Sequence, residues 1–337
     1  MNDGRSIRTT DGRSTKTDGR SATADGRSTT TEGSKRTNND SSTLPITGRS
    51  MSTASSWATT SSRDNTSTEG LFFTSLNSLA PTTIVMLHVL LSSHLEWAHC
   101  WPKLTEYHLL LPDLPQHSRS KHAGPFSFVV AADLVADMIR AHAHDGRAHV
   151  VGLSTGGFIT LELIRRHPDV VLSAFVSGAT PVNDFWKVVN SSPKITFLGL
   201  SAMLYSPRSL LLKATGWAPE FQNNELLKEV KQNITSRLYT AGCRETANWT
   251  AEDMAAVGKK DKRIALVAGG KQDNVEGMRE MGRIMQAMGV NEGKETRVFV
   301  VREAIHAWNL QNPLLFAKGV REWIEKGQMP ANFEMLE

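Results

Sequence analysis

The chain of 337 residues has little cysteine, and its N-terminal and C-terminal ends carry no targeting pattern. Only Cys100 and Cys243 are present, and the N-terminus lacks the apolar core that is typical of a secretion signal. The last residues, Glu-Met-Leu-Glu, are not a peroxisomal tripeptide. These absences argue against secretion and peroxisomal import, so a cytoplasmic location is expected.

The chain also lacks a strong excess of one charge. Its 38 Lys and Arg residues against 34 Asp and Glu residues give a net charge of +4, with a pI near 9.1. This charge is mild for the length and has no matching basic cluster, so neither nucleic acid nor a membrane is an expected partner. The apolar segments at residues 195–205 and 210–217 are too short and too interrupted to span a bilayer.

Large apolar residues are almost absent from the first 65 or so residues. In a background of Ser, Thr and Asn, the unit Asp-Gly-Arg-Ser begins at Asp3, Asp11, Asp18 and Asp25. Such a segment cannot bury enough surface to offset the entropy of an ordered chain, so residues 1–65 are expected to be a disordered low-complexity tail. The sequence leaves open whether this tail is real or a wrongly assigned gene start.

The most informative stretch is an apolar strand that runs into a serine flanked by glycines. Residues 148–153 lead into Gly152-x-Ser154-x-Gly156, and residues 158–167 then read as a helix. This pattern is typical of a nucleophile elbow, in which a strained turn projects the serine hydroxyl clear of the sheet and the glycines let the helix pack closely. The alternative is a glycine-rich structural turn whose serine caps a helix.

A hydroxyl is a poor nucleophile near neutral pH, so Ser154 needs a general base within hydrogen-bond reach and an acid that orients the base. A buried strand at residues 263–268 runs toward Asp273, and a second strand at residues 297–301 is followed by His306. Both side chains therefore sit just past strand ends. In chain order, the serine, the aspartate and the histidine form a candidate triad.

Over roughly residues 70–328 the chain resembles the α/β-hydrolase superfamily of the capped, serine-triad type. The elbow, the Asp273 loop and the His306-x-Trp308 segment carry the resemblance. It implies that Ser154 attacks a carbonyl, that His306 takes and returns the proton, and that Asp273 holds the imidazole tautomer and stabilises its charged form.

The resemblance implies an α/β fold with a mostly parallel sheet, helices on both faces and right-handed crossovers. One catalytic domain is expected over residues 66–337. Residues 183–262 are rich in helical signals and predict a helical cap inserted after the sixth strand. A cap over Ser154 would bury its own apolar segments, exclude water and shape an apolar acyl pocket. Asp184, at the start of this insertion, is the alternative acid.

Two backbone N–H groups must also point at the oxygen that becomes negative. The resemblance assigns one to Thr155, the residue after the nucleophile, and the other to the loop after the third strand, residues 83–88. The family continues this strand as His-Gly-x, whereas here His88 is followed by Val89 and Leu90. Leu90 is the expected second donor. A β-branched Val89 resists positive φ, so the loop is expected to be misaligned if its geometry needs the glycine.

A second departure lies in residues 113–120, Asp-Leu-Pro-Gln-His-Ser-Arg-Ser. They resemble the family's Asp-x-Pro-Gly-x-Gly-x-Ser turn, but Gln116 and Ser118 replace both glycines. Together with Val89, these replacements lead us to expect reduced activity or none.

No cofactor is expected, and the histidine-rich stretch around Asp145 does not predict a metal site. His142, His144 and His149 form neither a helical pair at i, i+4 nor the His-x-His-x-Asp-His arrangement of binuclear zinc hydrolases. They are better explained as the end of a helix predicted at residues 128–143 and the start of the next strand.

The expected function is serine hydrolysis of an ester, thioester or lactone through an acyl-enzyme, with a small apolar acyl metabolite as the partner. The general character resembles capped hydrolases of fungal secondary-metabolite pathways, including polyketide or toxin biosynthesis. Two alternatives stay open: hydrolysis of a carbon–carbon bond by the same triad, and ligand binding without catalysis by a member with a degenerate oxyanion loop. The oligomeric state is left open.

Overall fold

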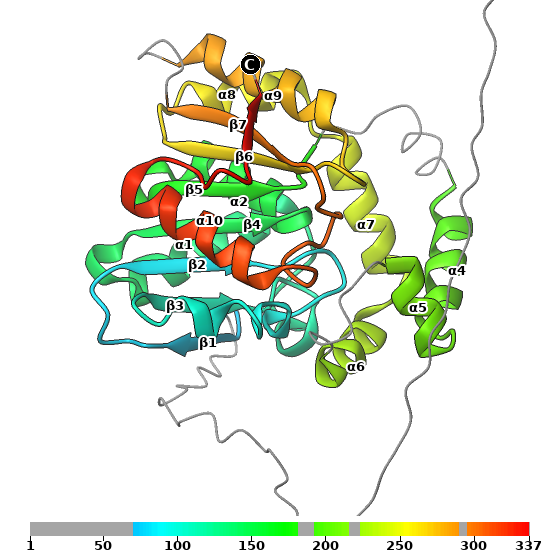
Figure 1. The fold of residues 1–337 in the computed structure, drawn as a ribbon. Coiled ribbons are helices and arrows are strands. Elements are labelled where there is room, and N and C mark those ends of the chain that lie inside the picture. The colour runs from blue at the N-terminus through cyan, green and yellow to red at the C-terminus, as the bar shows by residue number, and fades with distance from the viewer. Residues whose placement is uncertain (1–69, 181–191, 216–222, 290–294, 337) are drawn as a thin grey trace, which may run out of the picture. The chain divides into compact units, whose positions relative to one another are not determined.

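The computed structural model describes residues 70–180, 192–215, 223–289 and 295–336. The predicted tail, residues 1–65, and the alternative acid Asp184 lie outside these ranges. The described residues contain one eight-stranded sheet with the order β1-β3-β2-β4-β5-β6-β7-β8 (Figure 1). The strands are β1 (Phe73–Leu76), β2 (Thr83–Leu87), β3 (His108–Pro112), β4 (Ala148–Leu153), β5 (Val171–Ser177), β6 (Ile264–Gly269), β7 (Thr296–Val301) and β8 (Glu334–Leu336).

The central strands β3, β2, β4, β5, β6 and β7 pair in parallel. An antiparallel strand closes each edge, β1 against β3 and β8 against β7. Strands β2, β3 and β6 are buried along their whole length, as expected for a parallel sheet that is covered on both faces. The prediction of a mostly parallel sheet is confirmed.

Alternate residues of each strand point into two hydrophobic cores, one on each face of the sheet. In β2, Val85 and Leu87 join one core, whereas Ile84 and Met86 join the other. The first core packs against α1 (Phe128–His142), α2 (Thr155–Arg166), α8 (Ala251–Gly258) and α9 (Val275–Met288), and the second against α10 (Pro313–Lys326). The short 3-10 helices are η1 (His94–Trp97), η2 (Trp101–Lys103), η3 (Ser118–Ser120), η4 (His144–Gly146) and η5 (Pro168–Val170).

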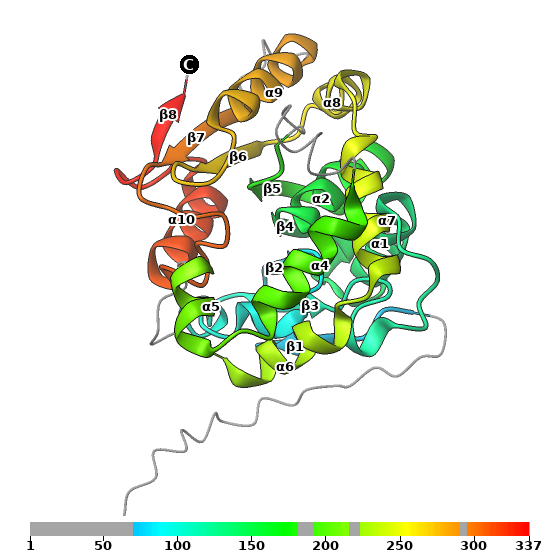
Figure 2. The same cartoon turned by 90° about the vertical axis from the view of Figure 1, so that its right-hand side faces the viewer.

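A helical cap lies beyond one end of the sheet, at the right in Figure 1 and toward the viewer in Figure 2. Its helices among the described residues are α4 (Pro193–Leu204), α5 (Arg208–Thr215), α6 (Asn224–Asn233) and α7 (Ser236–Ala247). The cap follows β5, the fifth described strand. The sequence-based count is one higher because it takes residues 83–88 as the third strand, and among the described residues this strand is the second. Helix α8 falls within the predicted cap range, 183–262, but packs against α2 and α9 on the sheet.

The cap leaves part of its apolar surface exposed. Ile195 and Leu198 of α4 are 73% and 68% exposed, and Leu210 of α5 is 54% exposed. The expectation that the cap buries these segments is therefore wrong for these three side chains. Apolar residues occur on every side of α4, and Leu204 is the one residue of this helix that is buried. No helix in the described ranges is long and apolar enough to cross a membrane.

Candidate active site

Ser154 occupies the sharp turn that the sequence predicts between a strand and a helix. It joins β4 to α2 with φ 55° and ψ −117°, a conformation that a residue other than glycine adopts only under strain. Its backbone N–H donates to the Ser177 oxygen at 2.7 Å, and its oxygen accepts from Phe158 N–H at 3.0 Å. These hydrogen bonds hold the strained turn in place.

The two glycines of the elbow are required by close backbone contacts. A Cβ atom on Gly152 would lie 2.2 Å from the Gly156 oxygen, and one on Gly156 would lie 2.1 Å from the Leu87 oxygen. Neither space can hold a methyl group. The motif therefore does what the elbow requires, since it lets α2 start directly against the ends of β4 and β2.

His306 and Asp273 form a direct pair past the ends of β7 and β6. His306 Nδ1 donates to Asp273 Oδ1 at 2.5 Å, and Asp273 Oδ2 accepts from Gly269 N–H at 2.6 Å. The aspartate side chain is 2% exposed, whereas the histidine side chain is 39% exposed. A buried carboxylate, with a hydrogen bond to each of its oxygens, thus holds Nδ1 of an imidazole ring that is partly exposed.

The environment of His306 favours its protonated form. Burial alone lowers its pKa, but the charge of Asp273, the hydrogen bond to Asp273 and the charge of Glu96 together raise the pKa above 6.5. Because the carboxylate can only accept, the Nδ1 atom carries the proton. Nε2 is then the nitrogen that can accept a proton from a nucleophile.

The structure brings the three triad candidates to one edge of the sheet. Leu153 and Ser177 are paired across β4 and β5, so the next residues, Ser154 and Gly178, are neighbours. A Cβ atom on Gly178 would lie 2.9 Å from His306 Cε1 and 3.4 Å from Asp273 Oδ2. Among the described residues, no hydrogen bond joins the Ser154 hydroxyl to His306.

The oxyanion loop, residues 88–92, has one backbone donor to spare. Val89 N–H donates to Glu96 Oε2 at 3.1 Å, and Leu91 N–H donates to His117 Nε2 at 2.9 Å. Ser92 N–H donates back to the Val89 oxygen at 3.1 Å. Leu90 N–H has no partner among the described residues. The geometry therefore supports the predicted choice of Leu90 over Val89 as the donor in this loop.

Thr155 is the first residue of α2, and a helix leaves the N–H groups of its first turn without an intrahelical partner. Its N–H is thus available beside the nucleophile. Together with the loop donor, this is the pair that the sequence predicts for the oxyanion.

The three residues that replace family glycines, Val89, Gln116 and Ser118, differ in backbone conformation. Val89 does not adopt positive φ, whereas Leu91 does, with φ 69°. The expected misalignment of the oxyanion loop stays a prediction. Gln116 and Ser118, which replace glycines, do adopt positive φ, 67° and 40°. Side chains support this strained turn: Gln116 Nε2 donates to the Lys121 oxygen at 3.0 Å, and Ser118 N–H donates to the cap.

Two polar residues that the sequence did not single out hold the oxyanion loop. Glu96 accepts from Val89 N–H and is 1% exposed. Asn233, at the end of α6, is also 1% exposed and donates from Nδ2 to the Leu91 oxygen at 3.2 Å and to the Ser92 oxygen at 2.8 Å. No local sequence signal distinguishes them from ordinary surface polar residues.

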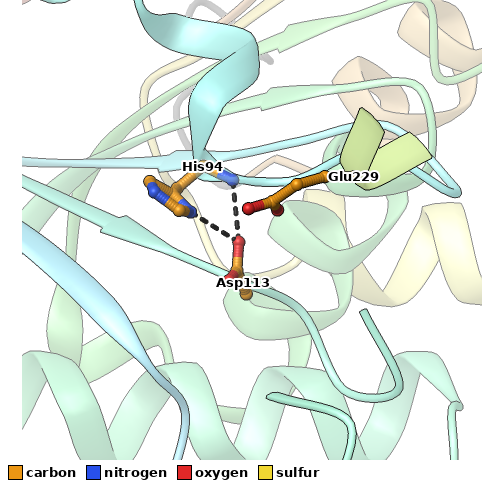
Figure 3. A group of neighbouring side chains, drawn as sticks. All are labelled: His94, Asp113 and Glu229. Atoms are coloured by element: carbon orange, nitrogen blue, oxygen red, sulfur yellow. Dashed lines mark hydrogen bonds and ion pairs between the residues drawn. The ribbon is translucent and has the colours of Figure 1, made fainter. Parts of the chain in front are cut away.

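His94, Asp113 and Glu229 meet where the core contacts α6 (Figure 3). Their ligand atoms lie within 4.8 Å of one another, close enough to hold a metal ion. However, Asp113 Oδ1 accepts from both the backbone N–H and Nδ1 of His94, each at 2.8 Å. The Nδ1 atom therefore carries a proton and offers no lone pair. We interpret His94 and Asp113 as a hydrogen-bonded pair of the core, beside which Glu229 of α6 lies without a hydrogen bond to either residue.

An elbow serine and an Asp–His pair at the carboxyl edge of a mostly parallel sheet, with a helical cap, define the α/β-hydrolase class. The chain belongs to the alpha/beta hydrolase fold family, whose model matches residues 82–313.

Two curated relatives bear on its chemistry. An AB hydrolase superfamily protein of Gibberella zeae is 30% identical over 276 residues, covering 80% of this chain and 89% of the relative. A pimeloyl-(acyl-carrier protein) methyl ester esterase of Neisseria meningitidis is 27% identical over 236 residues, covering 63% of this chain and 81% of the relative. The chain is thus an α/β hydrolase with relatives of the esterase type.

Solved structures share the fold. A thermophilic esterase from Thermogutta terrifontis has a TM-score of 0.56 and 18% identity, covering 76% of this chain and 93% of that chain. A hydrolase from Pseudomonas aeruginosa has a TM-score of 0.56 and 16% identity, covering 76% of this chain and 94% of that chain. At these identities the likeness shows the fold alone.

Proposed function

We propose that this protein is a serine hydrolase that cleaves an ester, thioester or lactone of a small apolar metabolite through an acyl-enzyme. The observation that carries the proposal is the 2.5 Å hydrogen bond from His306 Nδ1 to Asp273 Oδ1, beside the strained elbow of Ser154. A buried carboxylate that fixes one imidazole nitrogen leaves the other to act on the serine hydroxyl.

In the first half of the reaction, Ser154 Oγ attacks the carbonyl carbon of the substrate while His306 Nε2 takes the hydroxyl proton. The carbonyl oxygen becomes negative and accepts hydrogen bonds from the N–H groups of Leu90 and Thr155. The bond to the alcohol or thiol then breaks, and the leaving group takes the proton from His306. The acyl group remains as an ester of Ser154.

In the second half, a water molecule attacks the acyl-enzyme and gives its proton to His306 Nε2. The same two N–H groups stabilise the second oxyanion. The bond to Ser154 Oγ breaks, the proton returns to that oxygen, and the free acid leaves. Asp273 stays ionised throughout and stabilises the imidazolium that forms in each half.

An apolar acyl group matches the surroundings of the oxyanion loop. The side chain of Leu90 packs against the same hydrophobic core cluster as Leu200 of α4 and Tyr239 of α7. The name of the Neisseria relative, a methyl ester esterase, favours an ester substrate. A role in fungal secondary metabolism, such as polyketide or toxin biosynthesis in the cytosol, is part of the proposal and rests on the general character of the sequence. The relative from Gibberella zeae is named only as an AB hydrolase superfamily protein.

An assay of p-nitrophenyl acyl esters, with a thioester, a lactone and a diketone, tests the proposal. We expect the wild-type protein to turn over apolar acyl esters and Ser154→Ala to lose this turnover while keeping its fold. Ser192→Ala, which changes an exposed serine of the cap, serves as the matched control and should match wild type. Cleavage of the diketone alone would favour the carbon–carbon alternative, and no turnover of any of these substrates would contradict the proposal.

A further inference from the structure

Glu96 is a buried carboxyl group that the mechanism above does not use. It lies in η1 and is 1% exposed. Its Oε2 atom accepts from Val89 N–H at 3.1 Å, and its Oε1 atom accepts from Asn309 Nδ2 at 3.1 Å. One side chain thus bonds two segments that are far apart in the sequence.

Both segments carry groups of the candidate site. Val89 directly precedes Leu90, whose N–H is the spare donor of the oxyanion loop. Asn309 is fully buried and ends the histidine loop, residues 302–309, which carries His306. Glu96 is therefore the link between the loop that receives the oxyanion and the loop that supplies the base.

Burying a carboxylate destabilises the fold by about several kcal/mol of desolvation free energy unless its oxygens are hydrogen-bonded. Burial raises the pKa of Glu96 to about 7, although hydrogen bonds from Ser92, Val89 and Asn309 act against this rise. The titratable groups that interact with its charge are His306 and Cys100. The charge of Glu96 in turn raises the pKa of His306.

We propose that Glu96 is a positioning residue that holds the oxyanion loop against the histidine loop, so that Leu90 N–H stays free for the oxyanion. The inference rests on the proposed function. In this chain Val89 stands where the family has glycine, so backbone freedom cannot shape the loop. The loop is shaped instead by Glu96, which accepts the hydrogen bond of Val89 N–H. Val89 N–H therefore cannot compete with Leu90 N–H for the oxyanion.

Two substitutions separate this role from simple packing. Glu96→Leu removes both acceptors and frees Val89 N–H. Glu96→Gln keeps the length and one oxygen for Val89 N–H, and its amide can donate to Asn309 Oδ1, which is buried without a partner among the described residues. The glutamine variant therefore keeps both links and loses only the charge.

The test measures kcat and KM for an apolar p-nitrophenyl ester against pH in wild type and both variants. We expect Glu96→Leu to lower kcat about a hundredfold with little change in KM, the usual effect of losing one oxyanion donor. Glu96→Gln should keep kcat within about tenfold of wild type. The acid limb of its kcat–pH profile should move to lower pH, because the charge of Glu96, which raises the pKa of His306, is gone.

Glu303→Gln is the matched control, since Glu303 is an exposed acid of the histidine loop that pairs with Lys271. It should leave both kcat and the acid limb at their wild-type values. A wild-type kcat in Glu96→Leu would overturn the inference. A loss of kcat far beyond tenfold in Glu96→Gln, which keeps both links, would also overturn it, and this result decides the question if the leucine variant does not fold.

Hydrogen exchange distinguishes this inference from the proposed function. If wild type turns over no ester, the proposed function fails, and the positioning role is judged by exchange in a peptide covering residues 83–97. We expect faster exchange there in Glu96→Leu than in wild type, because Val89 N–H loses its acceptor. Unchanged exchange would overturn the link between the two loops.

Discussion

The side-chain amide of Asn233 donates a 2.8 Å hydrogen bond to the backbone oxygen of Ser92 and so joins the cap to the oxyanion loop. The same amide nitrogen also donates to the Leu91 oxygen and to Ser118 Oγ, and Asn233 Oδ1 accepts from Ser118 N–H at 2.7 Å. The cap therefore does more than cover the site. It fixes the backbone of the loop and of the strained turn in which Ser118 replaces a glycine.

Asn233→Ala should lower both stability and activity. Each buried hydrogen bond contributes about 1 kcal/mol, and the partners left unpaired add to the loss, so we expect the free energy of unfolding to fall by at least about 2 kcal/mol. The rate kcat should fall with it because the oxyanion loop loosens. Urea unfolding and ester turnover measure the two effects. Asn224→Ala, on the exposed side of the same helix, should change neither, and an equal effect in both variants would contradict this account.

The rate should depend on pH through His306. The charge of Asp273 raises its pKa above the ordinary value of 6.5 even though burial opposes the rise. A general base must be unprotonated, so kcat/KM should fall as pH drops through this raised value. Asp273→Asn should lower kcat by about four orders of magnitude and move the acid limb to lower pH. The change of an exposed acid, Asp137→Asn, is the control. An acid limb below pH 6.5 in wild type would contradict the assignment.

Acid should destabilise the fold around the oxyanion loop. Burial lowers the pKa of His88 to about 4 and that of His117 to about 3. Both are neutral acceptors: Leu114 N–H donates to His88 Nε2 at 3.0 Å, and Leu91 N–H to His117 Nε2. Below pH 6.5 the unfolded chain binds protons that the folded chain does not, so stability falls as pH drops toward these values.

Each of these two histidines should contribute up to about 1.4 kcal/mol per pH unit to that slope. Urea unfolding at several values between pH 7 and pH 4.5 measures it. His117→Gln keeps an acceptor for Leu91 N–H and a donor for the Pro115 oxygen but does not titrate, so its slope should be shallower. An exposed control, His122→Gln, should keep the wild-type slope. Equal slopes in all three proteins would refute the assignment.

Removing residues 1–65 should leave the melting temperature and any esterase activity almost unchanged. The segment has almost no large apolar residues with which to dock on the domain. Thermal denaturation and ester turnover of the shortened chain check this expectation. A large drop in melting temperature would show that the segment packs on the domain.

The central strands other than β3, and the triad candidates, could be predicted from the sequence because both depend on local patterns. The predicted strand at residues 263–268 is found at 264–269, and the predicted helix at 128–143 is found at 128–142. Buried parallel strands are continuous apolar runs, and the elbow has a fixed spacing. The edge strands β1 and β8, four and three residues long, have no such pattern and went unpredicted.

The residues that hold the oxyanion loop could not be predicted because their partners are distant in the chain. Asn233 bonds Leu91 across 142 positions, and Asn309 bonds Glu96 across 213. In the sequence Glu96 is one acid in a short turn, and nothing nearby indicates that it is buried. The positive φ of Leu91, whose N–H donates to His117 Nε2, could not be predicted for the same reason.

The central claim, that Ser154 is an activated nucleophile, is tested most directly by reaction with a fluorophosphonate probe followed by peptide mapping. The probe reports an activated serine without knowledge of the substrate. The account predicts one adduct, on Ser154, which forms in wild type and is absent from Ser154→Ala and strongly slowed in His306→Ala. No adduct on wild type, or an adduct on another serine that persists in Ser154→Ala, would contradict it.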